Sequence, residues 1–77
     1  MKELVETMAK ALVDYPDQVE LTEIGGGDTI VIELKTAKQD VGKIIGKKGR
    51  NIQAMRTILN GASKRLKKHV VLEIIDQ

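Results

Sequence analysis

The chain lacks cysteine, phenylalanine and tryptophan, and it holds one proline and one tyrosine among its 77 residues. Without cysteine there is no disulfide and no cysteine-ligated metal site, which suits a reducing compartment. Without aromatic rings, the core has to be built from aliphatic side chains. A chain this short buries only about 60% of the surface that its unfolded form exposes, so we expect one domain, residues 1–77, of modest stability.

Long hydrophobic runs are also missing. The first ten residues, MKELVETMAK, mix charged and apolar side chains. No apolar run reaches the roughly 18 residues of a membrane span, or the roughly 7 to 15 of a signal-peptide core. We therefore expect a cytoplasmic protein without a membrane partner.

The charges are unevenly distributed, although the net charge is only +2. Residues 1–34 have a net charge of −6, residues 35–69 a net charge of +10 with Asp40 as the sole acid, and residues 70–77 a net charge of −2. A run of charge is often no more than a solvated face. A block of +10 nevertheless repels itself unless an anion is near, and phosphate backbones are the commonest such partner.

Hydrophobic periodicity predicts a helix and a hairpin in the first half. Apolar residues at helical spacing run from Leu4 to Tyr15, through Met8, Ala11 and Leu12, and Pro16 ends the pattern. Two alternating stretches, 18–24 and 29–35, flank the turn sequence GGGD and predict a β-hairpin. The glycines are no dinucleotide-binding loop, since that motif opens a helix and here a strand follows.

The second half predicts two helices and a closing strand. Asp40 is a candidate N-cap for a helix of about two turns that ends before Gly46. A long amphipathic helix follows from about Arg50 to Leu66, and it continues through Gly61 because the spacing does not shift there. Its expected apolar face consists of Ile52, Met55, Ile58, Leu59, Ala62 and Leu66. The β-branched stretch HVVLEII then forms a strand, with Val70, Leu72 and Ile74 on one face.

The segment GKKG, residues 46–49, joins the two helices. Gly46 is expected to take left-handed angles that end the first helix, and Gly49 to avoid a Cβ clash at the start of the second. Two adjacent lysines contribute nothing to folding at such a turn, but they suit phosphate groups placed at the electropositive start of a helix. A Walker A loop is excluded, because Gly42 and Gly46 are too close and Lys48 replaces the Ser or Thr that binds magnesium.

The stretch VGKIIGKKGRNIQAMR, residues 41–56, resembles the Ile-Gly-x-x-Gly-x-x-Ile core of K-homology (KH) domains. The element order is similar to the type II variant, over nearly the whole chain, and most similar to small single-domain bacterial KH proteins. The resemblance implies an α+β fold, a type II KH domain of order α-β-β-α-α-β. Its three-stranded mixed sheet would have helices packed on one face.

The same resemblance implies a single-stranded RNA-binding protein of the RNA chaperone or post-transcriptional regulator type, without a cofactor. The loop would clamp the backbone of about four nucleotides. Bases would rest on Ile45, Ile52 and either Val31 or Ile32, and backbone groups of the second strand would read base edges. For Ile44 and Ile52, core packing is the competing interpretation. The candidate RNA-binding residues are Lys43, Ile45, Gly46, Lys47, Lys48, Gly49, Arg50, Asn51, Ile52 and Arg56.

The missing aromatic residues bear on affinity. Stacking on a ring contributes about 1 to 3 kcal/mol per base in other single-strand binders, and no ring is available near this loop. We therefore expect weak binding per domain. A second binding unit would compensate, as a homodimer or as a heterodimer with another KH-containing RNA-binding protein.

Three alternatives remain at this stage. An enzyme is disfavoured, because His69 is the sole histidine and no nucleophile or carboxylate pair accompanies it. A KH-fold protein-interaction or dimerisation module with little RNA binding is disfavoured by the loop lysines. Single-stranded DNA remains an alternative ligand.

A second basic cluster consists of Lys64, Arg65, Lys67 and Lys68. It either interacts with the negative end of the long helix or contacts further RNA or the ribosome.

Overall fold

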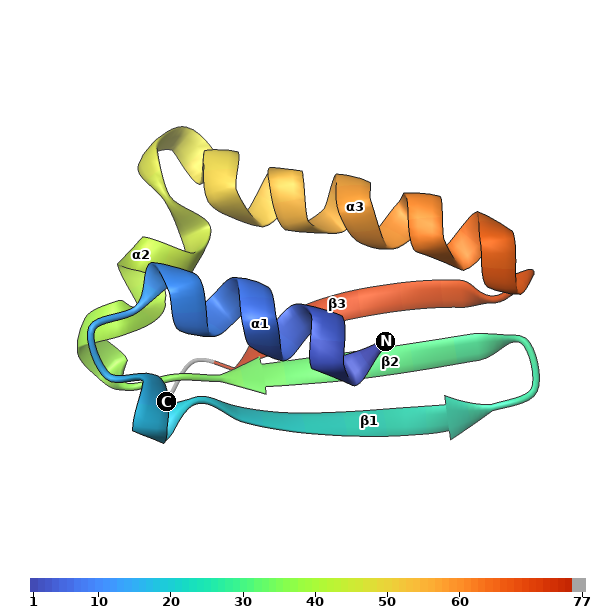
Figure 1. Ribbon diagram of the computed structural model, residues 1–77, viewed down its shortest axis with the longest axis horizontal. Coiled ribbons are helices and arrows are strands. Elements are labelled where there is room, and N and C mark those ends of the chain that lie inside the picture. Colours follow the sequence, from blue (N-terminus) through green and yellow to red (C-terminus); the bar gives the residue numbers. More distant parts are fainter. Residues whose placement is uncertain (76–77) are drawn as a thin grey trace.

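The first half of the chain folds into one helix and a hairpin (Figure 1). In this computed structural model, which describes residues 1–75, helix α1 spans Lys2–Leu12 and is followed by a short 3-10 turn at Pro16–Gln18. Strands β1 (Glu20–Gly26) and β2 (Thr29–Lys35) form the expected hairpin. Strand β1 runs further than the sequence suggested, because two of the three turn glycines pair with Thr29 and Ile30 of β2.

The second half supplies two helices and the third strand. A 3-10 turn at Lys38–Asp40 leads into the short helix α2 (Val41–Ile45). A further 3-10 turn, Lys47–Gly49, connects it to the long helix α3 (Arg50–Leu66), whose bounds are those predicted and which passes through Gly61. Strand β3 (His69–Ile75) follows, as expected.

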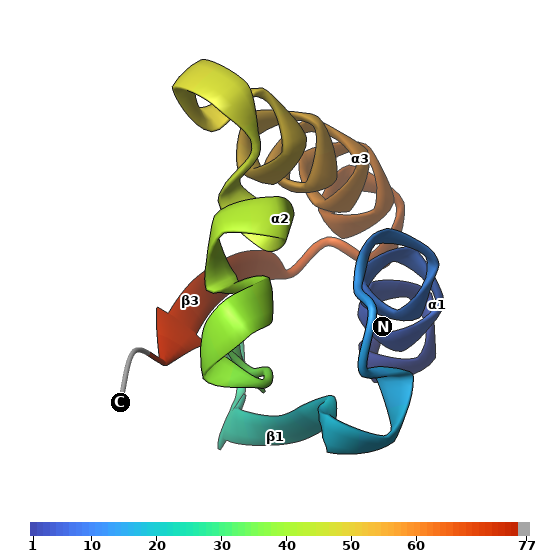
Figure 2. The same ribbon diagram turned by 90° about the vertical axis from the view of Figure 1, so that its left-hand side faces the viewer.

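The three strands form one mixed sheet in the order β1-β2-β3. Strands β1 and β2 pair antiparallel, and β2 and β3 pair parallel, with Thr29 opposite His69 and Lys35 opposite Ile75. Figure 2 shows the helices on one side of this sheet, with α1 toward β1 and α3 toward β3. Order, pairing and layering agree with the predicted type II arrangement.

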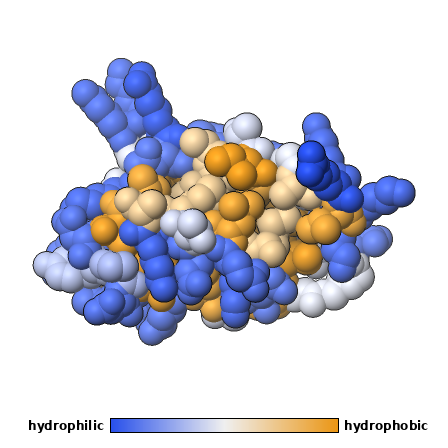
Figure 3. Space-filling model, viewed as in Figure 1, coloured by the Kyte–Doolittle hydropathy of each residue, from blue (hydrophilic) through white to orange (hydrophobic). Residues whose placement is uncertain are grey.

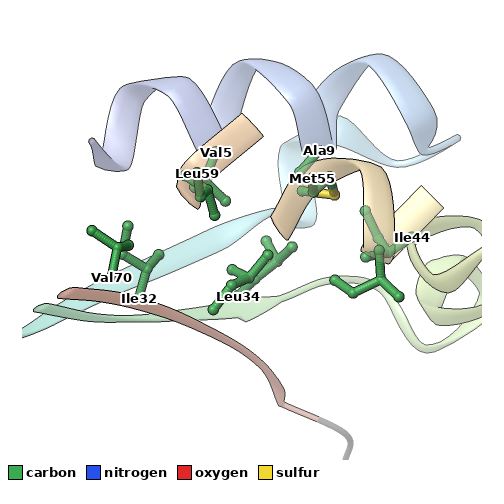
Figure 4. Close-up of a cluster of buried hydrophobic side chains, with 10 residues drawn as sticks. Val5, Ala9, Ile32, Leu34, Ile44, Met55, Leu59 and Val70 are labelled. Carbon is green, nitrogen blue, oxygen red and sulfur yellow. The ribbon is translucent and has the colours of Figure 1, made fainter. Parts of the chain in front are cut away.

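The core lies between the sheet and the helices and is aliphatic (Figure 4). Its fully buried members include Val5 of α1, Ile32 and Leu34 of β2 and Ile44 of α2. Helix α3 contributes Ile52, Met55 and Leu59, while β3 contributes Val70 and Leu72. The alternation predicted for β2 and β3 is therefore confirmed, and core packing is confirmed for Ile44 and Ile52.

The predicted buried face of α1 is wrong by about one position. Val5 and Ala9 are completely buried, whereas Leu4 is 37% exposed. The helix also ends at Leu12, because the next residue takes extended angles (φ −102°, ψ 158°), so Tyr15 lies beyond it. Met8 and Leu12 are partly buried and fit both the predicted and the observed face of the helix, so the apolar spacing alone does not distinguish the two faces.

The far side of α3 also differs from the prediction. Ile58 is 49% exposed and Leu66 is 54% exposed, although both belong to the expected apolar face. Only the stripe made by Ile52, Met55 and Leu59 reaches the core.

Asp40 does not cap α2, contrary to the prediction. Its backbone has helical angles (φ −96°, ψ −8°), whereas an N-cap residue usually lies in the extended region. The side chain is fully buried and instead accepts hydrogen bonds from the backbone N–H groups of Asp14 (3.2 Å) and Tyr15 (3.0 Å). Asp40 therefore ties the segment after α1 to the start of α2.

In the part of the chain that the structure describes, there is no helix both apolar enough and long enough to cross a membrane.

Candidate nucleic-acid interface

The GKKG loop projects from the molecule where α2 meets α3 (Figures 1 and 2). Gly46 has φ 78° and ψ 172°, a region that essentially only glycine occupies. A Cβ at this position would also lie 2.6 Å from Cγ of Asn51. Gly49 has left-handed angles (φ 73°, ψ 17°), while its nearest neighbour for a Cβ is 4.0 Å away.

The prediction for Gly46 is confirmed in part, because it ends α2 with a positive φ, although its ψ differs from that of a left-handed residue. The Cβ clash expected at Gly49 occurs instead at Gly46, and the left-handed conformation occurs at Gly49. Asn51 causes the close approach, because its Nδ2 donates a hydrogen bond to the carbonyl oxygen of Lys43 at 2.7 Å. This bond links the first turn of α3 to α2 and holds the loop between them.

The loop displays its positive charges to solvent. Lys47, Lys48 and Arg50 are exposed, and none of them forms an ion pair with any residue in the range 1–75. Lys48 has left-handed angles (φ 58°, ψ 25°), a conformation that costs a non-glycine residue about 1 to 2 kcal/mol. Strain of this kind is common at binding sites.

The start of α3 continues directly from the 3-10 turn, because the N–H of Arg50 bonds to the carbonyl oxygen of Lys47. Its N-cap residue is Gly49, which offers no side-chain cap, and no acidic residue lies in the first turn. The first N–H groups of a helix lack intrahelical acceptors and carry a partial positive charge. The loop therefore combines exposed cationic side chains with a helix start that carries partial positive charge, and both suit an anion.

A groove of about 230 Å³ lies between α3 and β3, and along α3 it begins at Arg56, about two turns after the loop. Within it, Nη2 of Arg56 donates a hydrogen bond to the carbonyl oxygen of Leu72 at 3.2 Å. The groove combines polar side chains with an apolar wall, and its lining consists of Arg56, Leu59, Asn60, Val70, Val71 and Leu72.

The strand beside this groove is β3, so the predicted role of the second strand is wrong. Strand β2 is central and pairs with β1 on one side and with β3 on the other, so its backbone groups are engaged within the sheet. Ile32 is completely buried and offers no surface to a base. Strand β3 lies at the sheet edge and is the strand whose outer backbone groups face the groove.

The structure separates the candidate isoleucines and distinguishes Lys43 from the loop lysines. Ile45 is 38% exposed beside the loop, whereas Ile52 is 7% exposed and packs in the core. Nζ of Lys43 lies 2.8 Å from Oδ2 of Asp14 and 3.8 Å from Oδ1 of Asp40. The hydrogen bond that the ammonium group donates to the carboxylate of Asp14 is the main cause that raises the pKa of Lys43, so its charge is engaged within the protein.

Sequence reasoning missed most of the groove wall, above all Asn60 and the β3 residues Val70 and Val71. Asn60 could have been found, because it lies four positions after Arg56 and so falls on the same side of a helix. The β3 residues could not have been found from the sequence, because their position beside α3 depends on the strand order.

Among residues 1–75 there is no group of three or more His, Asp or Glu side chains that could hold a metal ion.

A mixed three-stranded sheet, helices on one of its faces, and a glycine-bounded loop between the last two helices define a type II KH domain. Comparison with known proteins narrows this class. The family model described as KhpA/KhpB, KH domain, matches residues 2–74, and the chain belongs to this family.

Its relatives match over almost their full length. The chain is 57% identical over 75 residues to a protein named RNA-binding protein KhpA from Caldanaerobacter subterraneus subsp. tengcongensis, covering 97% of this chain and 100% of that one. It is 51% identical to the protein of the same name from Clostridium acetobutylicum, with the same coverage. The protein of that name from Chlamydia trachomatis is 48% identical, covering 100% of this chain and 99% of that one. No solved structure matches the chain.

Proposed function

We propose that this protein binds single-stranded RNA and grips the sugar-phosphate backbone with the GKKG loop. The observation that carries the proposal is the pair of exposed lysines without ion-pair partners in residues 1–75, held on a strained loop ahead of an uncapped helix. The relatives named RNA-binding protein KhpA support it, since they cover the whole of this module.

We infer different roles for the candidate residues. Gly46 and Gly49 let the RNA backbone approach closely, while Lys47, Lys48 and Arg50 neutralise phosphates. Asn51 and Ile52 hold the loop from within, through the bond to Lys43 and through the core. Lys43 contributes to RNA binding only indirectly, because its ammonium group is paired with Asp14 and Asp40.

Bases would leave the loop over Ile45 and enter the groove beside β3. Arg56 keeps several guanidinium donors besides the one on Leu72, and it can address a base edge or a phosphate. The outer edge of β3 offers further backbone groups to bases. Recognition through aliphatic contact and backbone groups gives weak sequence discrimination, because ring stacking is missing.

Such a site suits a binding protein without catalysis. A weak, backbone-directed grip fits an RNA chaperone or a post-transcriptional regulator that contacts many transcripts, and we propose that it acts in the cytoplasm. Binding that reads the backbone also accommodates single-stranded DNA, so matched RNA and DNA oligonucleotides should be compared. The 2′-hydroxyl is the group that distinguishes them.

The central test is a charge reversal in the loop. The double variant Lys47→Asp, Lys48→Asp should keep its fold, because Lys47 and Lys48 are exposed and aspartate tolerates left-handed angles. Its affinity for a single-stranded RNA should fall at least about tenfold in about 0.1 M salt, and its salt dependence should be shallower by up to about 0.7 per lost contact. Fluorescence anisotropy across a salt series measures both quantities.

A matched control reverses two charges elsewhere. The variant Lys2→Asp, Lys10→Asp changes the net charge equally on α1, which lies toward β1 (Figure 2), whereas the groove lies between α3 and β3. It should bind RNA much more tightly than the loop variant. Equal affinities for the two variants would mean that the net charge, and not the loop, governs binding.

We further propose that a second copy of the chain covers an apolar groove between α1 and α3. This groove has a volume of about 250 Å³, and it lies in the hydrophobic strip on the face shown in Figure 3. Ile58 borders it and is 49% exposed, so one surface supplies both a projection and a hollow, as a two-fold contact requires. Pairing would join two weak RNA sites. A larger KH-containing protein is the alternative occupant.

A further inference from the structure

A second cationic cluster lies at the C-terminal end of α3, and we call it the end cluster. All four of its members are exposed, and none forms an ion pair with any residue in the range 1–75; they are Lys64, Arg65, Lys67 and Lys68. Helix α3 has 17 residues, which places the end cluster about 25 Å from the GKKG loop. Figure 3 shows hydrophilic side chains projecting at both of these ends of the molecule.

Helix electrostatics accounts for only part of the end cluster. Lys64 and Arg65 lie in the last turn of α3, where a positive charge is favourable. Lys67 follows the helix with left-handed angles (φ 55°, ψ 38°), in a position where glycine is usual. Its N–H bonds to the carbonyl oxygen of Lys64 at 3.4 Å, and that of Lys68 bonds to Ser63 at 3.1 Å. These backbone bonds do not involve the lysine side chain, and glycine would make them at lower conformational cost.

The groove lies along the second half of α3, between the loop and the end cluster. Arg56 and Asn60 line it, and Lys64 falls on the same side of α3, four positions after Asn60. On the other wall, Val70 follows the end cluster by two positions. An extended strand that leaves the loop and passes through the groove would therefore reach the end cluster.

The acids near this end leave the end cluster positive. The β1–β2 turn approaches it, because the N–H of His69 donates to the carbonyl oxygen of Asp28 at 2.6 Å. The carboxylate of Asp28 forms no ion pair with the end cluster, whose own segment, residues 61–72, has no acid. Four like charges within five positions favour a polyanion.

We propose that the end cluster is a second phosphate-binding site, which extends the RNA path beyond the nucleotides that the loop clamps. The extension rests on the proposed RNA-binding function. It assigns the far phosphates of a longer strand to Lys67 and Lys68, with Lys64 and Arg65 beside them. A strand that fills only the loop does not reach the end cluster, so the number of nucleotides separates the two sites.

The test compares oligouridines of about four nucleotides, enough for the loop, with others of about twelve. The wild type should bind the longer strand more tightly and with a steeper salt dependence. The variant Lys67→Gly, Lys68→Gln should lose about fivefold in affinity per removed contact for the longer strand in about 0.1 M salt, and nothing for the shorter one. Its melting temperature should rise by roughly 4 to 8 °C, because glycine relieves the left-handed strain at position 67.

The controls separate this inference from the function on which it rests. The variant Lys2→Gln, Lys10→Gln removes two charges from α1 and should retain the advantage of the longer strand. An end-cluster variant that binds the longer strand as tightly as the wild type does, or that loses equally on both strands, overturns the extension. The loop variant Lys47→Asp, Lys48→Asp should fail on both strands, and normal binding by that variant would instead overturn the proposed function.

Discussion

At the scale of single residues, two lysines occupy backbone conformations that glycine or asparagine usually takes. Lys48 has φ 58° at the loop, and Lys67 has φ 55° after α3. Each conformation costs about 1 to 2 kcal/mol, which is a considerable share of the free energy of unfolding of a typical domain, about 5 to 15 kcal/mol. Both side chains extend into solvent. The chain thus accepts strain at the two points where we place phosphate contacts.

Asp40 is the residue on which the join between α1 and α2 depends. Replacing it with asparagine would turn an amide N–H₂ toward one of the two backbone N–H donors, and one of these groups would remain unsatisfied. Asp40→Asn should lower the free energy of unfolding by about 1 to 3 kcal/mol, measured by urea denaturation. The exposed Asp17→Asn is the control. Equal stability of the two variants would show that Asp40 does not hold the segment.

At the scale of elements, α3 shows what the sequence can predict. Its apolar spacing persists for nearly five turns, so the bounds at Arg50 and Leu66 were found correctly. The predicted apolar face of α3 was too wide, because the spacing of apolar residues does not show how far the sheet extends beneath the helix. The contacts of Asp40 span 25 and 26 positions, and no local pattern indicates them.

The loop was partly predictable for the same reason. Its glycines and lysines were found from their type and spacing, whereas the contact between Gly46 and Asn51 depends on how α2 and α3 are placed. The strand that borders the groove depends on sheet order, which sequence alone left open.

Gly61 offers a direct test of helix propensity within α3. A Cβ at this position would meet no atom within 4 Å, so Gly61→Ala should stabilise the protein by up to about 1 kcal/mol. The melting temperature, followed by circular dichroism, should rise by roughly 4 to 8 °C, and RNA affinity should not change. Gly46→Ala is the opposite control, because its Cβ would meet Asn51 at 2.6 Å. A stabilising effect there would contradict the described loop geometry.

At the scale of the whole molecule, the charge asymmetry of the sequence becomes spatial. The acidic first half forms α1 and the hairpin, while the basic segment forms α2, the loop and α3. The cations gather at the two ends of α3 beside the groove, so an approaching polyanion is attracted to this side. The apolar groove between α1 and α3 lies on another face of α3 and adjoins the loop only through Asn51.

The proposed pairing can be tested through Ile58. Because this side chain is 49% exposed, Ile58→Glu should leave the core intact while placing a charge in the contact. Sedimentation equilibrium should show that the wild type pairs at micromolar to millimolar concentration and that the variant remains a monomer. Thr57→Glu, one position away and exposed, is the control. A wild type that stays monomeric at all these concentrations would contradict the proposed pairing and favour a different protein as the occupant of this groove.

The parallel pairing of β2 with β3 has a consequence for biogenesis. Thr29 pairs with His69, so β2 can pair with β3 only after the ribosome has translated forty further residues. A nascent chain that has emerged only as far as α3 exposes one edge of β2 and cannot complete its sheet. Contacts so distant along the chain slow folding, and unpaired edges invite misassembly. Folding is therefore expected to finish only after the ribosome has made residues 69–75.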